Sequence, residues 1–262
     1  MIDWNGTTTN SMASLSGYST STLLKWLNIS TYFTPTRGFS FWGNDKKASR
    51  NDVKQGAIGN CWLLSAISAC AELPGTIEKN FGENAVTSFN NKVGFYDVQL
   101  NYLNVPITIR VDDLIPAYNS FTTTLFSAMV NGGVWTPVME KAFAKLYGNY
   151  SALVGYWSQI AIANIIGTPG FKVYIFNSAT GATLSSATIW TYVNDASVDD
   201  VMVANTRSTS VFGMTAPHAY TIVNNYEVKL LNGATVRLIR LRNPYATDGS
   251  QTTAYGDCDA EW

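Results

Sequence analysis

The alternation of apolar and polar positions divides the chain into a helix-rich half and a strand-rich half. Small serines alone interrupt the apolar residues of segment 62–71, which predicts a buried central helix. Segment 134–147 repeats apolar residues at helical spacing and predicts a second helix. Between them, segments 93–100 and 105–111 predict two strands, the latter by strict alternation.

The helical pattern stops after Ile166, where two glycines and a proline occupy three of the next four positions, and we place a domain boundary near Gly167. Beyond it the chain is β-rich, with one predicted helix in residues 182–193. Asn232-Gly233 is the strongest hairpin signal in the sequence. Five strands are predicted in this half, at residues 171–176, 200–204, 218–223, 226–230 and 236–242.

Residues 1–49 are rich in Ser, Thr, Asn and Gly, with a few aromatic anchors. They predict an extended leader packed on the surface of the first lobe, with a short helix at residues 21–27. The predicted fold class is therefore α+β, with a helical lobe over residues 50–167 and a β-rich lobe over residues 168–262. A cleft between two lobes is a usual place for a substrate site.

Composition narrows the classes of function. Charged residues make up 13% of the chain and its net charge is −1, without blocks of like charge, which argues against nucleic acid or an anionic membrane as a partner. The longest apolar run is too short to span a bilayer. The N-terminus lacks the basic and apolar regions of a secretory signal. We therefore expect a cytoplasmic protein.

Three cysteines, at positions 61, 70 and 258, are too few for a disulfide framework. Cys61 and Cys70 lie nine residues apart on one predicted helix, roughly 13.5 Å of rise, so they cannot be bridged. One histidine and no CxxC pair exclude a structural zinc site.

Cys61 stands directly after a glycine turn and directly before the apolar helix. A thiol in the first turn of a helix feels the partial positive charge of free N–H groups, which favours the nucleophilic thiolate. The alternative is a cysteine that only fills space in the core. Such a residue is more typical of mid-helix, where Cys70 lies.

The single histidine, His218, heads an alternating strand, and Asn243 closes another strand soon after. Cys, His and Asn in this order are the parts of a cysteine-nucleophile triad. Cys61 would attack a carbonyl carbon, His218 would take its proton, and Asn243 would orient the imidazole. The side-chain amide of Gln55 would donate to the oxyanion, a contribution of roughly 3–4 kcal/mol per donor.

These residues resemble the protease core of the calpain family. Residues 55–64 resemble its nucleophile motif, although Asn60 stands where the family usually has Asp. Residues 218–220 match its histidine motif. Residues 240–244 match its asparagine motif, although Tyr245 follows where calpains typically have Trp. Segments 111–113 and 135–145 also look typical of the family, and the match runs in order from residue 50 to residue 262.

The resemblance implies a papain-like fold in two half-domains and hydrolysis of peptide bonds in intracellular proteins through a thioester acyl-enzyme. It also implies calcium as an activator, bound by one loop in each half. Asp52 and Asp257 match acidic calcium ligands, but Gly133 stands where another acid is expected. No cofactor is expected for the chemistry itself. Regulatory domains or a partner chain outside this sequence are expected as well.

Two other readings stay open. The first is a calpain-like binding or regulatory module that keeps the cleft but has no catalytic activity. The small number of acidic ligands in the two expected calcium loops favours this hypothesis. The presence of all four site side chains argues against it. Acyl transfer to an acceptor other than water would use the same triad and the same first half-reaction. The pair Asp112-Asp113 is interpreted as a strand-end turn with capping acids rather than as an acid/base or metal site.

Overall fold

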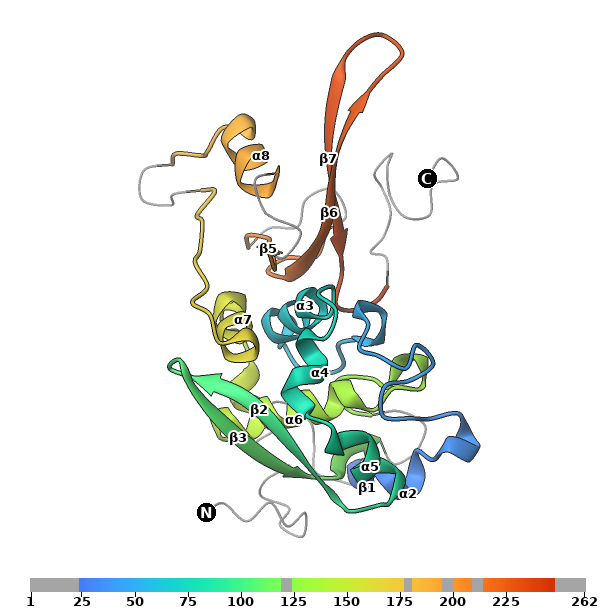
Figure 1. Cartoon of the computed structure of the whole chain (residues 1–262). Coiled ribbons are helices and arrows are strands. Elements are labelled where there is room, and N and C mark those ends of the chain that lie inside the picture. Colours follow the sequence, from blue (N-terminus) through green and yellow to red (C-terminus); the bar gives the residue numbers. More distant parts are fainter. Residues whose placement is uncertain (1–23, 119–123, 177–180, 195–199, 209–213, 248–262) are drawn as a thin grey trace.

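The computed structural model describes residues 24–118, 124–176, 181–194, 200–208 and 214–247, and it has a mixed α+β fold (Figure 1). The helices that build it are α2 (Ile29–Tyr32), α3 (Cys61–Cys70), α4 (Thr76–Phe81), α5 (Asn84–Asn90), α6 (Trp135–Tyr147), α7 (Ser158–Ile166) and α8 (Ser186–Asn194). The strands are β1 (Leu24–Asn28), β2 (Phe95–Tyr102), β3 (Val105–Asp112), β4 (Leu114–Tyr118), β5 (Val203–Asn205), β6 (Ala219–Lys229) and β7 (Thr235–Arg242).

Helix α3 lies at the centre of the core, as its apolar sequence predicts. Every residue from Trp62 to Cys70 is buried, because α7 covers one side of the helix, β6 another, and the 3₁₀ helix Arg50–Asp52 a third. Helix α6 presents Val138, Met139 and Phe143 to the same core, each fully buried. The predictions for these two helices are confirmed to within one residue at each end.

Strands β2 and β3 form an antiparallel hairpin in the register Phe95↔Asp112 to Tyr102↔Val105. The face that carries Tyr96, Val98 and Leu100 is buried against the core, where α4 and α7 pack on β2. The predicted strands are therefore confirmed with small shifts of their ends. Asp112 and Asp113 end the hairpin and accept hydrogen bonds within the fold, as a strand-end turn requires.

The segment before residue 50 contributes more than a surface covering. Strand β1 pairs antiparallel with β4, Leu24 opposite Tyr118 and Asn28 opposite Leu114. Ile29, Phe33 and Phe41 are buried in the core. The predicted helix at residues 21–27 is wrong where it can be compared, from residue 24 onward, because pairing with a distant strand overrides local helix preference.

The second half is a three-stranded antiparallel sheet in the order β5-β6-β7. The two strands predicted at 218–223 and 226–230 are one strand, β6, with a register shift between Ile222 and Asn224. The predicted hairpin at Asn232-Gly233 is confirmed: Gly233 takes φ of 83° and the Asn232 side chain accepts from Ala234 N–H at 3.0 Å. In Figure 1 this hairpin projects away from the body of the molecule.

The strand predicted at residues 171–176 is wrong, since that segment forms one isolated bridge, Phe176 to Thr183. Helix α7 ends at Ile166, and the next residue, Gly167, takes a left-handed conformation with φ of 77°. Among the described residues, no helix is both long enough and apolar enough to cross a membrane.

Three hydrogen bonds fix the sheet against the segment that carries the cysteine. Thr221 Oγ1 donates to Ser65 O of α3 at 2.8 Å, a buried contact. Arg242, the last residue of β7, donates from Nη2 to Val53 O at 2.6 Å. Gln55 N–H donates to Pro244 O at 2.7 Å. The beginning of β6 and the end of β7 are thereby held beside the start of α3.

Candidate active site

Cys61 is the first residue of α3, so its N–H belongs to the four at a helix start that lack an intrahelical acceptor. The loop before it must pass very close to the neighbouring backbone. A Cβ added to Gly56 would lie 1.9 Å from Phe126 O, so only glycine fits there. The next residue, Ala57, donates its N–H to Leu125 O at 3.0 Å. Gly56 thus allows the loop that precedes Cys61, here called the cysteine loop, to pack directly against the backbone of residues 125–126.

His218 and Asn243 lie together at the base of the β6–β7 hairpin, one residue before β6 and one residue after β7. His218 Nε2 lies 2.9 Å from Asn243 Oδ1. The same Oδ1 accepts from Tyr245 N–H at 3.0 Å, and Asn243 Nδ2 donates to Thr247 O at 3.2 Å. Since these partners fix the amide orientation, Nε2 of neutral His218 carries the proton and Nδ1 is left as an acceptor.

Two aromatic rings hold the imidazole in place. Tyr245 stacks on it with ring centroids 4.6 Å apart and an angle of 9° between the planes. Tyr220 contacts it edge-on at 5.0 Å. The sequence singled out Tyr245 only as a departure from the calpain motif, and it gave no signal for this stacking.

The thiol of Cys61 is half-buried, and the backbone N–H of Ala219, the residue after His218, faces it. Burial raises the pKa of the Cys61 thiol above its usual 9.0, although the N–H groups of Ala219, Trp62 and Cys61 oppose the shift. The sequence predicted a stabilised thiolate at Cys61. In this arrangement the effect of burial on the pKa is larger than the opposing effect of the N–H groups at the helix start, so the neutral thiol is favoured.

His218 is also shielded from solvent, being 4% exposed. Burial lowers its pKa below 6.5, and the hydrogen bond with Asn243 acts in the opposite direction. Thiol and imidazole are consequently both neutral at neutral pH. Among the described residues, no hydrogen bond joins Cys61 to His218.

Gln55 is buried, and its Nε2 donates to Ile58 O at 2.7 Å inside the cysteine loop. Its Oε1 is buried without a hydrogen-bond partner in the described part of the chain. The amide is therefore fixed within the loop that carries Cys61. The structure places Gln55, Cys61, His218 and Asn243 in one region, through the Gln55–Pro244 and Ala219–Cys61 contacts.

A buried polar network below Cys61 escaped the sequence analysis. Asn60 Nδ2 donates to Glu140 Oε1 at 2.7 Å, and Ser127 donates to Glu140 Oε2 from both N–H, at 3.0 Å, and Oγ, at 2.8 Å. Glu140 is 1% exposed. The signal that could have revealed it is an acid three and four residues before Phe143 and Ala144, on the apolar face of a helix.

Asp52 is the predicted calcium ligand that lies within the described residues, and its Oδ1 is buried without a hydrogen-bond partner in that part of the chain. Asp52 Oδ2 already accepts from Trp135 Nε1 at 2.9 Å and from Ser49 N–H at 3.1 Å. The nearby Asp45 is exposed and accepts from Asn131. Calcium prefers six to eight oxygens with several carboxylates, and no group of three His, Cys, Asp or Glu side chains within the described ranges could hold a metal. The second predicted ligand, Asp257, lies outside the described residues.

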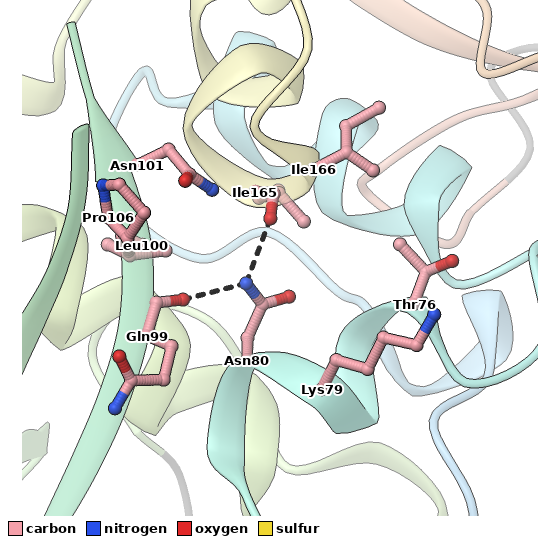
Figure 2. A pocket seen from close by; sticks show the side chains of 9 residues that line it. All are labelled: Thr76, Lys79, Asn80, Gln99, Leu100, Asn101, Pro106, Ile165 and Ile166. Carbon is pink, nitrogen blue, oxygen red and sulfur yellow. Dashed lines mark hydrogen bonds between the residues drawn. The ribbon is translucent and has the colours of Figure 1, made fainter. Parts of the chain in front are cut away.

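A concavity of about 270 Å³ lies between α4, β2 and α7 (Figure 2). Asn80 crosses its floor, where Nδ2 donates to Gln99 O at 2.7 Å and to Ile165 O at 2.9 Å. These bonds tie the three elements together, which is a structural role. None of the predicted site residues lines this concavity.

Comparison with known proteins agrees with these features. The family described as "Calpain family cysteine protease" matches residues 8–262. The Calpain-type cysteine protease DEK1 of Arabidopsis thaliana is 26% identical over 227 residues, which cover 82% of this chain and 10% of that protein. The Calpain-1 catalytic subunit of Sus scrofa is 29% identical over 217 residues, which cover 82% of this chain and 30% of that protein.

Calpain clp-4 of Caenorhabditis elegans is likewise 29% identical, over 224 residues that cover 82% of this chain and 30% of that protein. The chain thus spans less than a third of the length of these relatives. The family match covers nearly all of the sequence, including the cysteine, histidine and asparagine motifs. The chain therefore belongs to the calpain family of cysteine proteases.

Proposed function

We propose that this chain is the catalytic core of an endopeptidase that cleaves peptide bonds in proteins through Cys61, His218 and Asn243. The observation that carries the proposal is the His218–Asn243 pair, with Nε2 and Oδ1 2.9 Å apart, beside a cysteine at a helix start. The bond from Asn243 leaves Nδ1 of His218 as the atom that accepts the thiol proton.

In the proposed reaction, Cys61 Sγ bonds to the carbonyl carbon as its proton passes to His218 Nδ1. The carbonyl oxygen becomes an oxyanion, which the N–H of Cys61 and the amide of Gln55 would stabilise. The imidazolium then protonates the leaving amine as the C–N bond breaks, which leaves a thioester. Water, deprotonated by His218, attacks that thioester and releases the acid and the thiol.

The proposal includes a division into two lobes near Gly167, where α7 ends in a left-handed glycine. Cys61 and Gln55 belong to the first lobe, and His218 and Asn243 to the second. Because no hydrogen bond between Cys61 and His218 is found in the described part of the chain, the proposal includes an approach of the two lobes before proton transfer. The proposed chemistry itself needs no cofactor.

A second candidate, a silent binding module, is favoured by the same missing contact and by the raised pKa of Cys61. The deciding experiment is labelling with an epoxysuccinyl probe, followed by mass spectrometry, with calcium and with chelator in parallel. Selective modification of Cys61 together with cleavage of a peptide substrate supports the protease. Absence of both, in both conditions, supports the binding module, and labelling only with calcium identifies calcium as an activator.

Product analysis with an added amine separates hydrolysis from acyl transfer. Hydrolysis gives a free carboxylate product, whereas transfer gives the amide of the added amine, because the two routes diverge only after the thioester. We expect the carboxylate.

A further inference from the structure

Glu140 is an unusual residue for the middle of a buried helix. It belongs to α6 and is 1% exposed, although a buried carboxylate is costly unless donors surround it. Its two oxygens accept three hydrogen bonds, one from Asn60 and two from Ser127. All three groups, from these two residues, donate to the carboxyl oxygens, which suits an ionised carboxylate.

Asn60 breaks the local rule for a helix start in order to meet Glu140. Asn is among the best N-cap residues, because its side-chain oxygen accepts from the N–H groups of the first turn. Asn60 is the N-cap of α3, yet its side chain makes no capping bond. It donates instead to Glu140, and its Oδ1 is buried without a partner in the described part of the chain. Because the Asn60 side chain does not cap α3, its contact with Glu140 indicates a role other than stabilising the helix.

The network acts on the peptide that carries the proposed nucleophile. Asn60 is fully buried, its backbone N–H donates to Ile58 O, and its carbonyl accepts from Leu63 and Leu64. Together with the side-chain bond to Glu140, these hydrogen bonds restrain rotation of the Asn60–Cys61 peptide. Its N–H is that of Cys61, which in the proposed function faces the oxyanion. The required position of such a donor is narrow, because a displacement of about 1 Å weakens catalysis by orders of magnitude.

We propose that Glu140 is a positioning residue of the site: its carboxylate, anchored by Ser127, holds the amide of Asn60 and thereby fixes the Asn60–Cys61 peptide. This inference rests on the proposed function. The assignment goes beyond the four residues that the motifs identify, because Glu140 lies 80 residues from Asn60 in sequence and its hydrogen bonds within the described residues go to Asn60 and Ser127.

The positioning depends on the charge of Glu140. Burial raises its pKa to about 7, against the opposing effect of the bonds from Ser127 and Asn60. The titratable groups around it are Tyr150, whose pKa the carboxylate raises, and Cys61, one residue beyond Asn60. Lys141, next on α6, is turned to Asp112. Positioning should therefore weaken as pH falls through about 7, above the range of His218, whose pKa lies below 6.5.

The test is the pH profile of kcat and KM for a fluorogenic peptide, from about pH 5.5 to about 9, on the full chain. Glu140→Gln removes the charge at constant size. We expect kcat at alkaline pH to fall on the order of tenfold to a hundredfold, with KM changed less than about twofold. The acid limb near pH 7 should disappear. Alkylation of Cys61 by iodoacetamide, which forms no oxyanion, should change far less than kcat.

Glu78→Gln is the matched control. Glu78 also accepts a backbone N–H, from Ala48 at 2.9 Å, but it lies on α4, apart from the cysteine loop. Its profile should overlay that of the unaltered chain.

Ser127→Ala keeps the inference testable if Glu140→Gln does not fold. Loss of the Ser127 hydroxyl bond should raise the pKa of Glu140 and move the acid limb to higher pH, a shift that a purely structural role would not produce. An unchanged limb in both variants, or a parallel fall in kcat and alkylation, overturns the inference. An unaltered chain that cleaves no peptide overturns the proposed function itself.

Discussion

The half of the molecule that carries Cys61 and the half that carries His218 are built very differently. The continuous apolar core runs from Leu27 to Ile165 and includes most of α3. In the sheet half, β6 buries only its first three residues and then becomes exposed, and Val228 is 41% exposed. The cysteine therefore stands on a densely packed body, whereas the histidine stands at the foot of a thinly covered sheet.

This difference in packing means that the position of Cys61 is more firmly fixed than the position of the His218–Asn243 pair relative to it. Gly56, Asn60 and Glu140 tie the cysteine loop into the packed body. His218 and Asn243 are tied to each other, and a few hydrogen bonds such as Thr221 to Ser65 set their place relative to Cys61. A movement between the halves would change the distance from thiol to imidazole while the His218–Asn243 pair stays intact.

The largest effect is expected when the sulfur of Cys61, the proposed nucleophile of the packed half, is removed. Cys61→Ala should abolish peptide cleavage, a loss on the order of a millionfold in kcat. Because Cys61 is only half-buried, the melting temperature should stay within a few degrees. Activity assays and calorimetry on the same preparation measure both. Cys70→Ala is the control, since that thiol is fully buried with its pKa raised to about 12 and should leave kcat in place. Cleavage retained by Cys61→Ala would remove the triad assignment.

A second test uses the charge buried in the packed half. The pKa of Glu140 rises from 4.5 to about 7 on folding, so its contribution to stability is fully present below pH 4.5 and is lost as pH rises through about 7. The loss amounts to about 3 kcal/mol in the free energy of unfolding. Urea unfolding of the unaltered chain and of Glu140→Gln across this range should give curves that diverge in slope. Parallel curves would contradict the raised pKa.

A matched pair of valines measures the difference in packing directly. Val138 on α6 is fully buried, and Val228 on β6 is 41% exposed. Val138→Ala should lower the free energy of unfolding by about 2–3 kcal/mol, from lost burial and a residual cavity. Val228→Ala should lower it by less than about 1 kcal/mol. Denaturant midpoints at constant m-value measure both losses. Equal losses of stability in the two variants would contradict the difference in packing between the two halves.

The last test concerns the close contact between the cysteine loop and the backbone of residues 125–126. Gly56→Ala places a Cβ 1.9 Å from Phe126 O and should destabilise the chain by about 1–3 kcal/mol, with loss of activity from displacement of Gln55. At Gly59 a Cβ would meet Val154 Cγ1 at 3.5 Å, an ordinary contact, so Gly59→Ala should cost less than about 1 kcal/mol. Thermal unfolding of both variants provides the measurement. Equal effects would show that the loop can move away from residues 125–126.

Local patterns predicted those elements whose backbone hydrogen bonds close within one helix or across one short turn. The apolar run after Cys61 and the helical spacing after Val134 gave α3 and α6, and Asn232-Gly233 gave the hairpin. Residues 24–28 form a strand instead of a helix because β4, about 90 positions later in the sequence, pairs with them. No local pattern contains that partner.

The site divides in the same way. Motif order pointed to Cys61, His218 and Asn243, and their roles stay predictions until activity is measured. Two properties were beyond the sequence. The contact between Asn60 and Glu140 joins distant segments, and the pKa of the thiol depends on how fully α3 and β6 shield it. Both follow from tertiary packing.

The β6–β7 hairpin has a consequence for engineering this chain. His218 and Asn243 flank its open end, whereas Asn232-Gly233 forms its tip at the far end of the ribbon. We expect a peptide tag or a reporter inserted at the tip to leave both the strand register and the site unchanged. Deleting one residue inside β7 would instead turn Asn243 to the opposite face, because side chains alternate along a strand. Changes of length are therefore safe at the tip and harmful along its arms.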